Sequence, residues 1–271
     1  MEQISVNNQE YAVYVHQHND TLPYLLMLHG FMGDHRVFDH LIDELCELYN
    51  PVTIDLLGHG ASSNPSDPSR YNEDNQIKDI VSIIQTKNLS PLFLYGYSMG
   101  GRLALKVTLN SPSLFNGLIL ESTNCGISDS QKRKERQKAD GARARQIKED
   151  FEQFLADWSK LNLFKSPLPV DKSLARKYQH IQHDQSPGAL AASLNGFGTG
   201  SMSPVCHKLS ELNLPTLLLG GSADEKYQGI NQYLADQLPN ATFWSIKAGH
   251  RIHLNNPSIL TNRVNDFLRS L

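Results

Sequence analysis

The chain has 271 residues, of which 39% are hydrophobic, which fits one large α/β domain with an insertion and excludes intrinsic disorder. Lysine and arginine number 25 against 28 aspartate and glutamate residues, so the formal net charge is -3. Such a chain has no overall basic field that would hold it on nucleic acid or on an anionic membrane. We therefore expect no nucleic-acid partner.

The three cysteines, Cys46, Cys125 and Cys206, are widely spaced and include no C-x-x-C pair. This pattern indicates neither a disulfide framework nor a cysteine zinc site, and it fits a reducing compartment. The N-terminal residues lack the regions of a secretory signal, and no apolar run approaches the roughly 18 residues that a membrane helix needs. We expect a cytoplasmic protein without membrane insertion.

Short β-rich segments alternate with segments of helical spacing along the chain. The expected strands are 12–15, 24–28, 52–54, 91–95, 118–120, 216–219 and 242–246, and the expected helices are 37–48, 77–85, 99–109 and 227–238. Several of the strands are continuous apolar runs, which is typical of strands that are buried on both faces of a sheet. The alternation predicts an α/β fold with a doubly wound, mainly parallel sheet.

The alternation stops after Glu121 and resumes only near Leu214, so the residues between them predict an inserted helical cap. We assign 1–123 to the first part of the core, 124–203 to the cap and 204–271 to the second part of the core. Within the cap, residues 132–148 carry eight basic side chains against Glu135 and Asp140. A solvated helix face fits this run, whereas a nuclear address or a nucleic-acid patch is disfavoured because the run has no interleaved aromatic residues.

A G-x-S-x-G motif, Gly96-Tyr97-Ser98-Met99-Gly100, lies between an expected strand and an expected helix. A serine on such a sharp turn has a strained backbone, and small neighbours leave its Oγ exposed at the helix N-terminus. Ser98 is therefore a candidate nucleophile.

Two further residues follow expected strands in the order that a serine triad of this type requires. Asp224 comes after the strand at 216–219, and His250 comes after the strand at 242–246. His250 would accept the Ser98 proton, and Asp224 would fix the imidazole tautomer. Glu225 is a rival for the acidic position, but the loop length favours Asp224.

The segment His29-Gly30-Phe31-Met32-Gly33 follows the strand at 24–28, where the second half of an oxyanion hole would lie. The backbone N–H groups of Phe31 and Met99 are the candidate donors. We interpret His29 as a loop-bracing residue and His59 as part of a scaffold turn.

Metal and phosphate sites are not indicated. The pairs His16/His18 and His180/His183 lack a third ligand, and Gly196-Phe197-Gly198-Thr199-Gly200 lacks the lysine and the βαβ context of a phosphate loop. We interpret this glycine-rich segment as a cap hinge or return loop, and we expect no metal and no cofactor.

Taken together, these motifs resemble the α/β-hydrolase superfamily and, more specifically, the 2-succinyl-6-hydroxy-2,4-cyclohexadiene-1-carboxylate synthases of menaquinone and phylloquinone biosynthesis. The stretches that carry the resemblance run from residue 25 to about 256. They are His29–Gly33, Gly96–Arg102, Leu120-Glu121-Ser122, Glu135-Arg136 with Asp140, Phe154 with Asp157-Trp158 and Leu163-Phe164, Gly198–Gly200, Asp224–Tyr227 and Ala248–His250. The more specific members are Arg102, the Glu135-Arg136 pair with Asp140, and the Trp158 segment.

The resemblance implies a lyase without a cofactor that eliminates pyruvate from 2-succinyl-5-enolpyruvyl-6-hydroxy-3-cyclohexene-1-carboxylate. Arg102 and Arg136 would bind carboxylates of this small anionic tricarboxylate, and Tyr97 and Trp158 would line the pocket, with ordinary packing an equal alternative for Trp158. Relatives usually have another arginine where this chain has Gln182-His183, and a tryptophan near the position of Cys206. Either the pocket is rearranged, with His180, His183 or Arg176 taking over from the missing arginine, or the substrate differs.

Two other functions use the same core. A serine hydrolase of ester or carbon–carbon bonds would have the same triad, and only the cap arginines favour the lyase. A binding protein of this fold without activity would typically lack a triad residue, and all three are present here.

Overall fold

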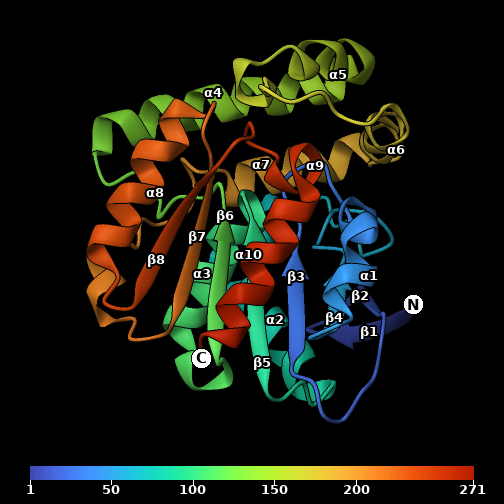
Figure 1. Ribbon diagram of the computed structural model, residues 1–271. Helices are drawn as coiled ribbons and strands as arrows, with labels where there is room; N and C mark the ends of the chain where they lie inside the picture. The colour runs from blue at the N-terminus through green and yellow to red at the C-terminus, as the bar shows by residue number, and fades with distance from the viewer.

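The computed structural model describes residues 1–271 as one eight-stranded sheet with helices on both faces and a helical cap across one end (Figure 1). The strands are β1 (Glu2–Val6), β2 (Gln9–Val15), β3 (Tyr24–Leu28), β4 (Asn50–Ile54), β5 (Leu92–Tyr97), β6 (Gly117–Glu121), β7 (Thr216–Gly221) and β8 (Ala241–Ile246). Their order is β1-β2-β4-β3-β5-β6-β7-β8, with β1–β2 and β2–β4 antiparallel and all other pairs parallel. The predicted doubly wound, mainly parallel sheet is confirmed.

Alternate residues of each central strand pack on opposite faces of the sheet. Leu26 and Leu28 of β3 belong to the core beneath α2 (Glu73–Thr86), α3 (Met99–Asn110) and α8 (Glu225–Gln237). Leu25 and Met27 belong to the core beneath α1 (Ile42–Leu45) and α10 (Pro257–Arg269). Because both sides of each pleat are covered, the continuous apolar runs of the sequence are buried throughout.

The cap is inserted between β6 and β7 and contains α4 (Ser130–Glu149), α5 (Phe151–Ser159), α6 (Lys172–His183) and α7 (Pro187–Phe197). Each helix has a capping side chain at its N-terminus, in order Asp129, Asp150, Asp171 and Ser186. Figure 1 shows α4, α5 and α6 above the carboxyl ends of the parallel strands. A small cluster that includes Met32, Ile147, Phe154 and Leu190 joins the cap to the loop after β3.

Two expected elements differ from the structure. The continuous helix predicted at 37–48 is wrong, because a 3₁₀ helix at His35–Leu41, capped by the Asp34 side chain, precedes the four-residue α1. The sequence also gave no expectation of β1, since only Ile4 and Val6 are buried in this edge strand and its other residues are exposed. Edge position and short length leave too little apolar periodicity to identify these elements.

The expectation that the cysteines form no disulfide is also wrong. Cys125 and Cys206 are joined, although 81 positions separate them, and Cys46 is free. The two cysteines lie where the chain enters and leaves the cap, so the insertion brings its own ends together. No helix of the chain has the length and apolar character to cross a membrane.

The strand order places the loops that follow β3, β5, β7 and β8 at one end of the sheet. After β3 the chain continues to β4 on one side, and β5 returns to pair with the other side of β3. Such a reversal of strand order leaves a crevice at the carboxyl ends of the strands. The loops that follow β3, β5, β7 and β8 therefore meet beneath the cap.

Candidate active site

Ser98 occupies a strained turn between β5 and α3. Its φ of 51° and ψ of -104° lie in a region that side chains rarely adopt. The backbone N–H of Ser98 donates to the Glu121 carbonyl oxygen at 2.9 Å, which ties the turn to the end of β6. The turn holds the hydroxyl at the wall of a cavity rather than in the helix.

The two glycines of the motif are required by close backbone contacts. A Cβ atom on Gly96 would lie 2.6 Å from the Gly100 carbonyl oxygen, and one on Gly100 would overlap the carbonyl oxygen of Leu28 in β3. Larger residues would therefore push the helix away from the sheet and displace Ser98.

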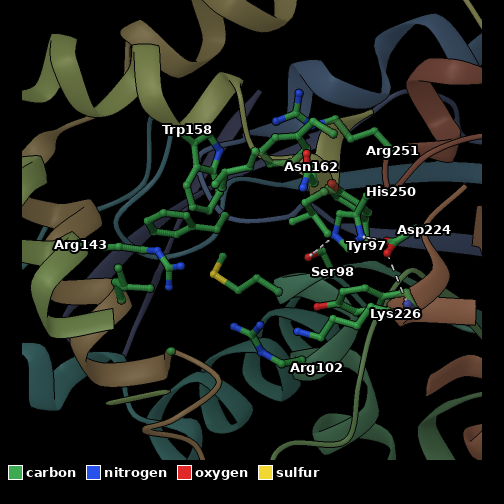
Figure 2. A pocket seen from close by; sticks show the side chains of 18 of the residues that line it. Tyr97, Ser98, Arg102, Arg143, Trp158, Asn162, Asp224, Lys226, His250 and Arg251 are labelled. Carbon is green, nitrogen blue, oxygen red and sulfur yellow. Dashed lines mark hydrogen bonds and ion pairs between the residues drawn. The ribbon is translucent and has the colours of Figure 1, made fainter. Parts of the chain in front are cut away.

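The structure brings together the three residues that the sequence predicted as a triad. His250 Nε2 lies 3.1 Å from Ser98 Oγ, and His250 Nδ1 lies 2.6 Å from Asp224 Oδ2 (Figure 2). Asp224 is buried, whereas the rival acid Glu225 is exposed. This is the relay geometry in which serine can lose a proton to histidine.

Backbone hydrogen bonds between the loops after β7 and β8 fix the positions of Asp224 and His250 relative to each other. Ser222 N–H donates to the Ile246 carbonyl oxygen at 2.7 Å, and Ala223 N–H donates to that of Ala248 at 3.0 Å. The Tyr227 ring packs edge-on against the imidazole of His250, with centroids 4.5 Å apart. The imidazole is therefore fixed by packing as well as by its hydrogen bonds.

Burial lowers the pKa of His250 below its ordinary value of 6.5, although the hydrogen bond and charge of Asp224 act in the opposite direction. The neutral imidazole therefore predominates at neutral pH. A neutral imidazole is the form that can accept a proton.

The two predicted oxyanion donors flank Ser98. Met99 is the first residue of α3, so its N–H belongs to the first turn, where helix N–H groups have no intrahelical partner. Phe31 follows β3 and lines the same cavity as Ser98. The β3 loop runs close to the turn, because a Cβ atom on Gly30 would lie 2.5 Å from Tyr97 Cε1. An oxyanion that forms beside Ser98 would lie between these two segments.

A cavity of about 590 Å³ lies between the triad and the cap. Its walls include all nine residues that the sequence predicted: Phe31, Tyr97, Ser98, Met99, Arg102, Arg136, Trp158, Asp224 and His250. They also include three cationic residues that the sequence did not identify as site residues: Arg143, Lys226 and Arg251. The volume is large enough for a small molecule with several polar arms.

Arg102 projects from α3 into this cavity and is buried. Its guanidinium donates to Thr199 Oγ1 at 2.9 Å and to the Phe197 carbonyl oxygen at 3.1 Å, while its Nε has no partner. Burial lowers its pKa to about 10, which leaves the group charged at neutral pH. No carboxylate of the chain pairs with Arg102, so its positive charge is available to a ligand.

Arg136 and Arg143 lie on one face of α4 and share Asp140. Arg136 Nε donates to both Asp140 oxygens at 2.8 and 2.9 Å, and Arg143 Nη1 donates to Oδ1 at 3.1 Å. The buried carboxylate orients both guanidiniums toward the cavity. The other six basic residues of the run lie outside the cavity wall, so most of this run is an ordinary solvated face.

Tyr97 and Trp158 lie on opposite sides of the cavity. Tyr97 is buried beneath the triad, with its ring centroid 5.6 Å from that of His250. Trp158 packs against Phe31, Phe154 and Phe164 at centroid distances of 5.8, 5.5 and 5.5 Å, and its indole N–H has no partner. Trp158 therefore both packs the cap and presents a free donor.

The cap residues expected to replace the missing arginine do not line the cavity. His180 and Arg176 are exposed, and His183 faces outward, with its Nδ1 3.3 Å from Glu152. The expectation that one of them takes over is therefore wrong. Sequence reasoning did not identify Arg251 as a site residue, although it directly follows the predicted triad residue His250, and the structure places it in the cavity wall.

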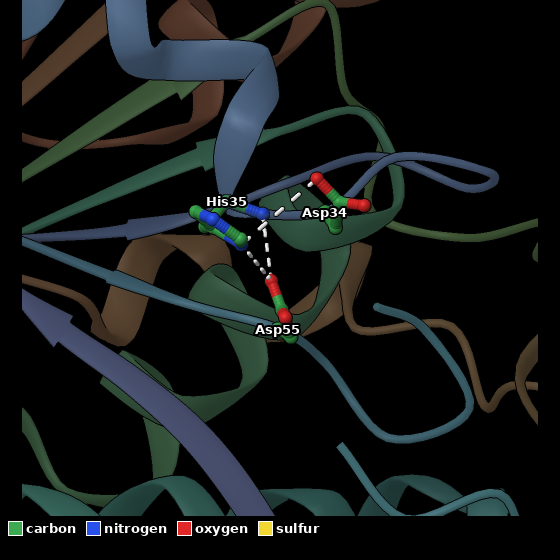
Figure 3. A group of neighbouring side chains, drawn as sticks. All are labelled: Asp34, His35 and Asp55. Carbon is green, nitrogen blue, oxygen red and sulfur yellow. Dashed lines mark hydrogen bonds and ion pairs between the residues drawn. The ribbon is translucent and has the colours of Figure 1, made fainter. Parts of the chain in front are cut away.

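A group outside the cavity, Asp34, His35 and Asp55, has the residue types of a metal site (Figure 3). Its carboxylates are already used within the fold. Asp55 accepts the backbone N–H and Nδ1–H of His35 at 2.7 and 2.8 Å, and Asp34 accepts two hydrogen bonds from Arg36 Nε. We interpret the group as a set of hydrogen bonds that joins the loops after β3 and β4.

The two other histidines near these loops are structural. His29 is buried, and its Nε2 accepts the Leu56 N–H at 2.9 Å, so it braces the loop as expected. His59 is buried against it, with ring centroids 5.1 Å apart. Neither residue lines the cavity.

A family model described as alpha/beta hydrolase fold matches residues 23–257. A Bacillus subtilis (strain 168) protein, provisionally named 2-succinyl-6-hydroxy-2,4-cyclohexadiene-1-carboxylate synthase, is 34% identical over 91% of this chain and 90% of its own. A protein of the same name from Serratia proteamaculans (strain 568) is 28% identical over 91% and 93% of the two chains.

Two solved structures extend the comparison. The structure of MenH from S. aureus has a TM-score of 0.90 at 33% identity and covers 96% of this chain and 98% of that chain. The enol-lactonase from Burkholderia xenovorans LB400 has a TM-score of 0.83 at 17% identity and covers 99% and 100% of the two chains. The second likeness shows the fold alone.

Proposed function

Because the chain belongs to the α/β-hydrolase fold family and, within it, to the 2-succinyl-6-hydroxy-2,4-cyclohexadiene-1-carboxylate synthases, we propose that it is an enzyme of menaquinone biosynthesis. Its proposed reaction is the elimination of pyruvate from 2-succinyl-5-enolpyruvyl-6-hydroxy-3-cyclohexene-1-carboxylate. The observation that carries the proposal is the charge of the cavity. Arg102, Lys226 and Arg251 line it beside Ser98, and none of them forms an ion pair within the chain.

In the proposed mechanism Ser98 acts as a base rather than as a nucleophile. His250 accepts the hydroxyl proton, with Asp224 steadying the imidazolium, and the serine oxygen removes the ring proton at C2, next to the succinyl ketone. The electrons move to the ketone oxygen, which the N–H groups of Phe31 and Met99 would stabilise. When the ketone reforms, double bonds appear at C2–C3 and C4–C5 and the C5–O bond breaks.

The leaving enolate of pyruvate then takes up a proton. The number of protons is conserved, because the one removed from C2 is the one held by the Ser98–His250 pair. The reaction consists of proton transfers and one bond cleavage, so it needs no metal or organic cofactor. The substrate has three carboxylates, which the cavity cations would orient by charge-assisted hydrogen bonds.

The test is incubation of the purified protein with the enolpyruvyl substrate, with the diene product followed by its absorbance and pyruvate assayed separately. Equal amounts of the two products at a rate proportional to protein would support the lyase. Turnover of neutral esters with an acyl group trapped on Ser98, and no pyruvate from the enolpyruvyl compound, would show a serine hydrolase instead.

A further inference from the structure

Arg251 is one of the cavity cations, and neither the mechanism nor the family resemblance gives it a role of its own. It follows His250 directly, at the start of α9 (Ile252–Asn255), and lines the cavity. Its Nε is buried without a hydrogen-bond partner, and no carboxylate of the chain forms an ion pair with it. A buried donor on a charged group without a partner costs free energy unless a ligand satisfies it.

Two aromatic rings of the cap hold the guanidinium in place. Its carbon lies 3.7 Å from the centroid of Phe164 and 4.3 Å from that of Tyr178. Contacts with ring faces attract and orient a cation but leave its in-plane N–H donors free. The contacts therefore fix where the positive charge lies and do not neutralise it.

Arg251 lies on a different side of Ser98 from the cations of the core. Figure 2 shows Arg102 and Lys226 on one side of the serine and Arg251 on the other, with His250 beside it. A ligand with carboxylates on separate arms needs cations on more than one side. Helix α6 supplies none, because its Arg176 and His180 are exposed and away from the cavity.

We infer that Arg251 is a substrate-binding residue that determines specificity for a third carboxylate, and this inference rests on the proposed function. Its guanidinium contacts one carboxylate arm of the substrate from the His250 side. The cap segment around Gln182 and His183 places no cation in the cavity wall, so Arg251 is the cation on this side of the serine. Arg102 and Arg136 remain for the other two arms.

The test compares Arg251→Gln and Arg251→Lys with a matched control, Arg176→Gln, which changes an exposed arginine of the cap. We expect Arg251→Gln to raise KM about 10-fold to 100-fold with kcat within a few-fold, because a charge-assisted contact is lost in binding. Arg251→Lys should recover part of the loss, and Arg176→Gln should stay within about twofold.

A second measurement separates ligand binding from a structural role. Each of the three substrate carboxylates is converted in turn to its primary amide, and kcat/KM is measured for wild type and Arg251→Gln. We expect one amide to weaken wild-type turnover markedly and to have little further effect on Arg251→Gln, because the two changes remove the same contact. The inference is wrong if all three amides lower kcat/KM equally in wild type and in Arg251→Gln. It is also wrong if the variants lose only kcat and thermal stability, because Arg251 would then serve only to pack the cap. If the wild-type protein itself releases no pyruvate, the proposed function is wrong, and the Arg251 inference is wrong with it. If wild type is active and only the Arg251 results disagree, the inference alone is wrong.

Discussion

Arg102 of α3 donates a hydrogen bond to Thr199 Oγ1 across 2.9 Å, so the helix that follows Ser98 is joined directly to the end of the cap. The same guanidinium lines the cavity and has no carboxylate partner. One side chain thus connects the two parts of the molecule and presents charge to a ligand. Substitutions that remove one role at a time separate these two contributions.

We predict that Arg102→Ala lowers kcat/KM for the tricarboxylate by some 30-fold to 1000-fold, equivalent to about 2 to 4 kcal/mol of transition-state stabilisation. The control Thr199→Val removes the hydrogen bond and keeps the charge, so it should cost less than about 1 kcal/mol in the same assay. Steady-state kinetics on folded proteins measures both. Equal losses in the two variants would mean that Arg102 acts only as a tether of the cap.

We predict that Ser98→Ala lowers kcat by at least about 1000-fold while the fold is retained, since the variant lacks the hydroxyl oxygen that His250 Nε2 contacts. The double variant Ser98→Ala with His250→Ala should lose no more activity than either single variant, because the residues act as one unit. Single-turnover pyruvate release and circular dichroism are the measurements. Near-normal turnover of Ser98→Ala would remove serine from the mechanism.

The pH dependence follows from His250. Burial lowers its pKa below 6.5, and the active form is the neutral imidazole, so kcat/KM should be level through neutral pH and fall only as the pH drops through that lowered pKa. In Asp224→Asn the carboxylate no longer favours the imidazolium, so the acid limb should move to lower pH as the plateau falls. A pH–rate profile of both proteins tests this. An acid limb centred well above 6.5 would contradict the assignment of His250 as the base.

The disulfide between Cys125 and Cys206 should stabilise the protein. It closes a loop of 81 positions across the whole cap, for which loop entropy predicts roughly 4.5 kcal/mol in the free energy of unfolding, with about 2 to 4 kcal/mol typical of measured values. Cys125→Ser with Cys206→Ser should therefore unfold at lower denaturant concentration, whereas Cys46→Ser should not. Thiol titration of the denatured, unreduced chain should find one free thiol. Three thiols before reduction would show that the bond is absent.

The sheet could be predicted because its pattern is local. Continuous apolar runs such as the one at 24–28 indicate strands covered on both faces, and their alternation with helical spacing fixes the parallel order. Apolar periodicity could not predict the 3₁₀ turn at His35–Leu41 or the edge strand β1, because each buries only a few side chains. Such short elements are stabilised by the tertiary contacts of the segments that pack on them.

The reactive turn and its two partners could be predicted from local patterns. Gly96 and Gly100 around Ser98 meet a backbone requirement of the turn, and Asp224 and His250 follow strands whose carboxyl ends must share one edge of a parallel sheet. Three further cations of the cavity, Arg143, Lys226 and Arg251, became evident only from the fold. The position of Arg143, the contacts of Arg251 with Phe164 and Tyr178, and the pairing of Cys125 with Cys206 depend on how the insertion folds back over the core. That arrangement results from packing between residues far apart in the chain, which the local periodicity of the sequence does not predict.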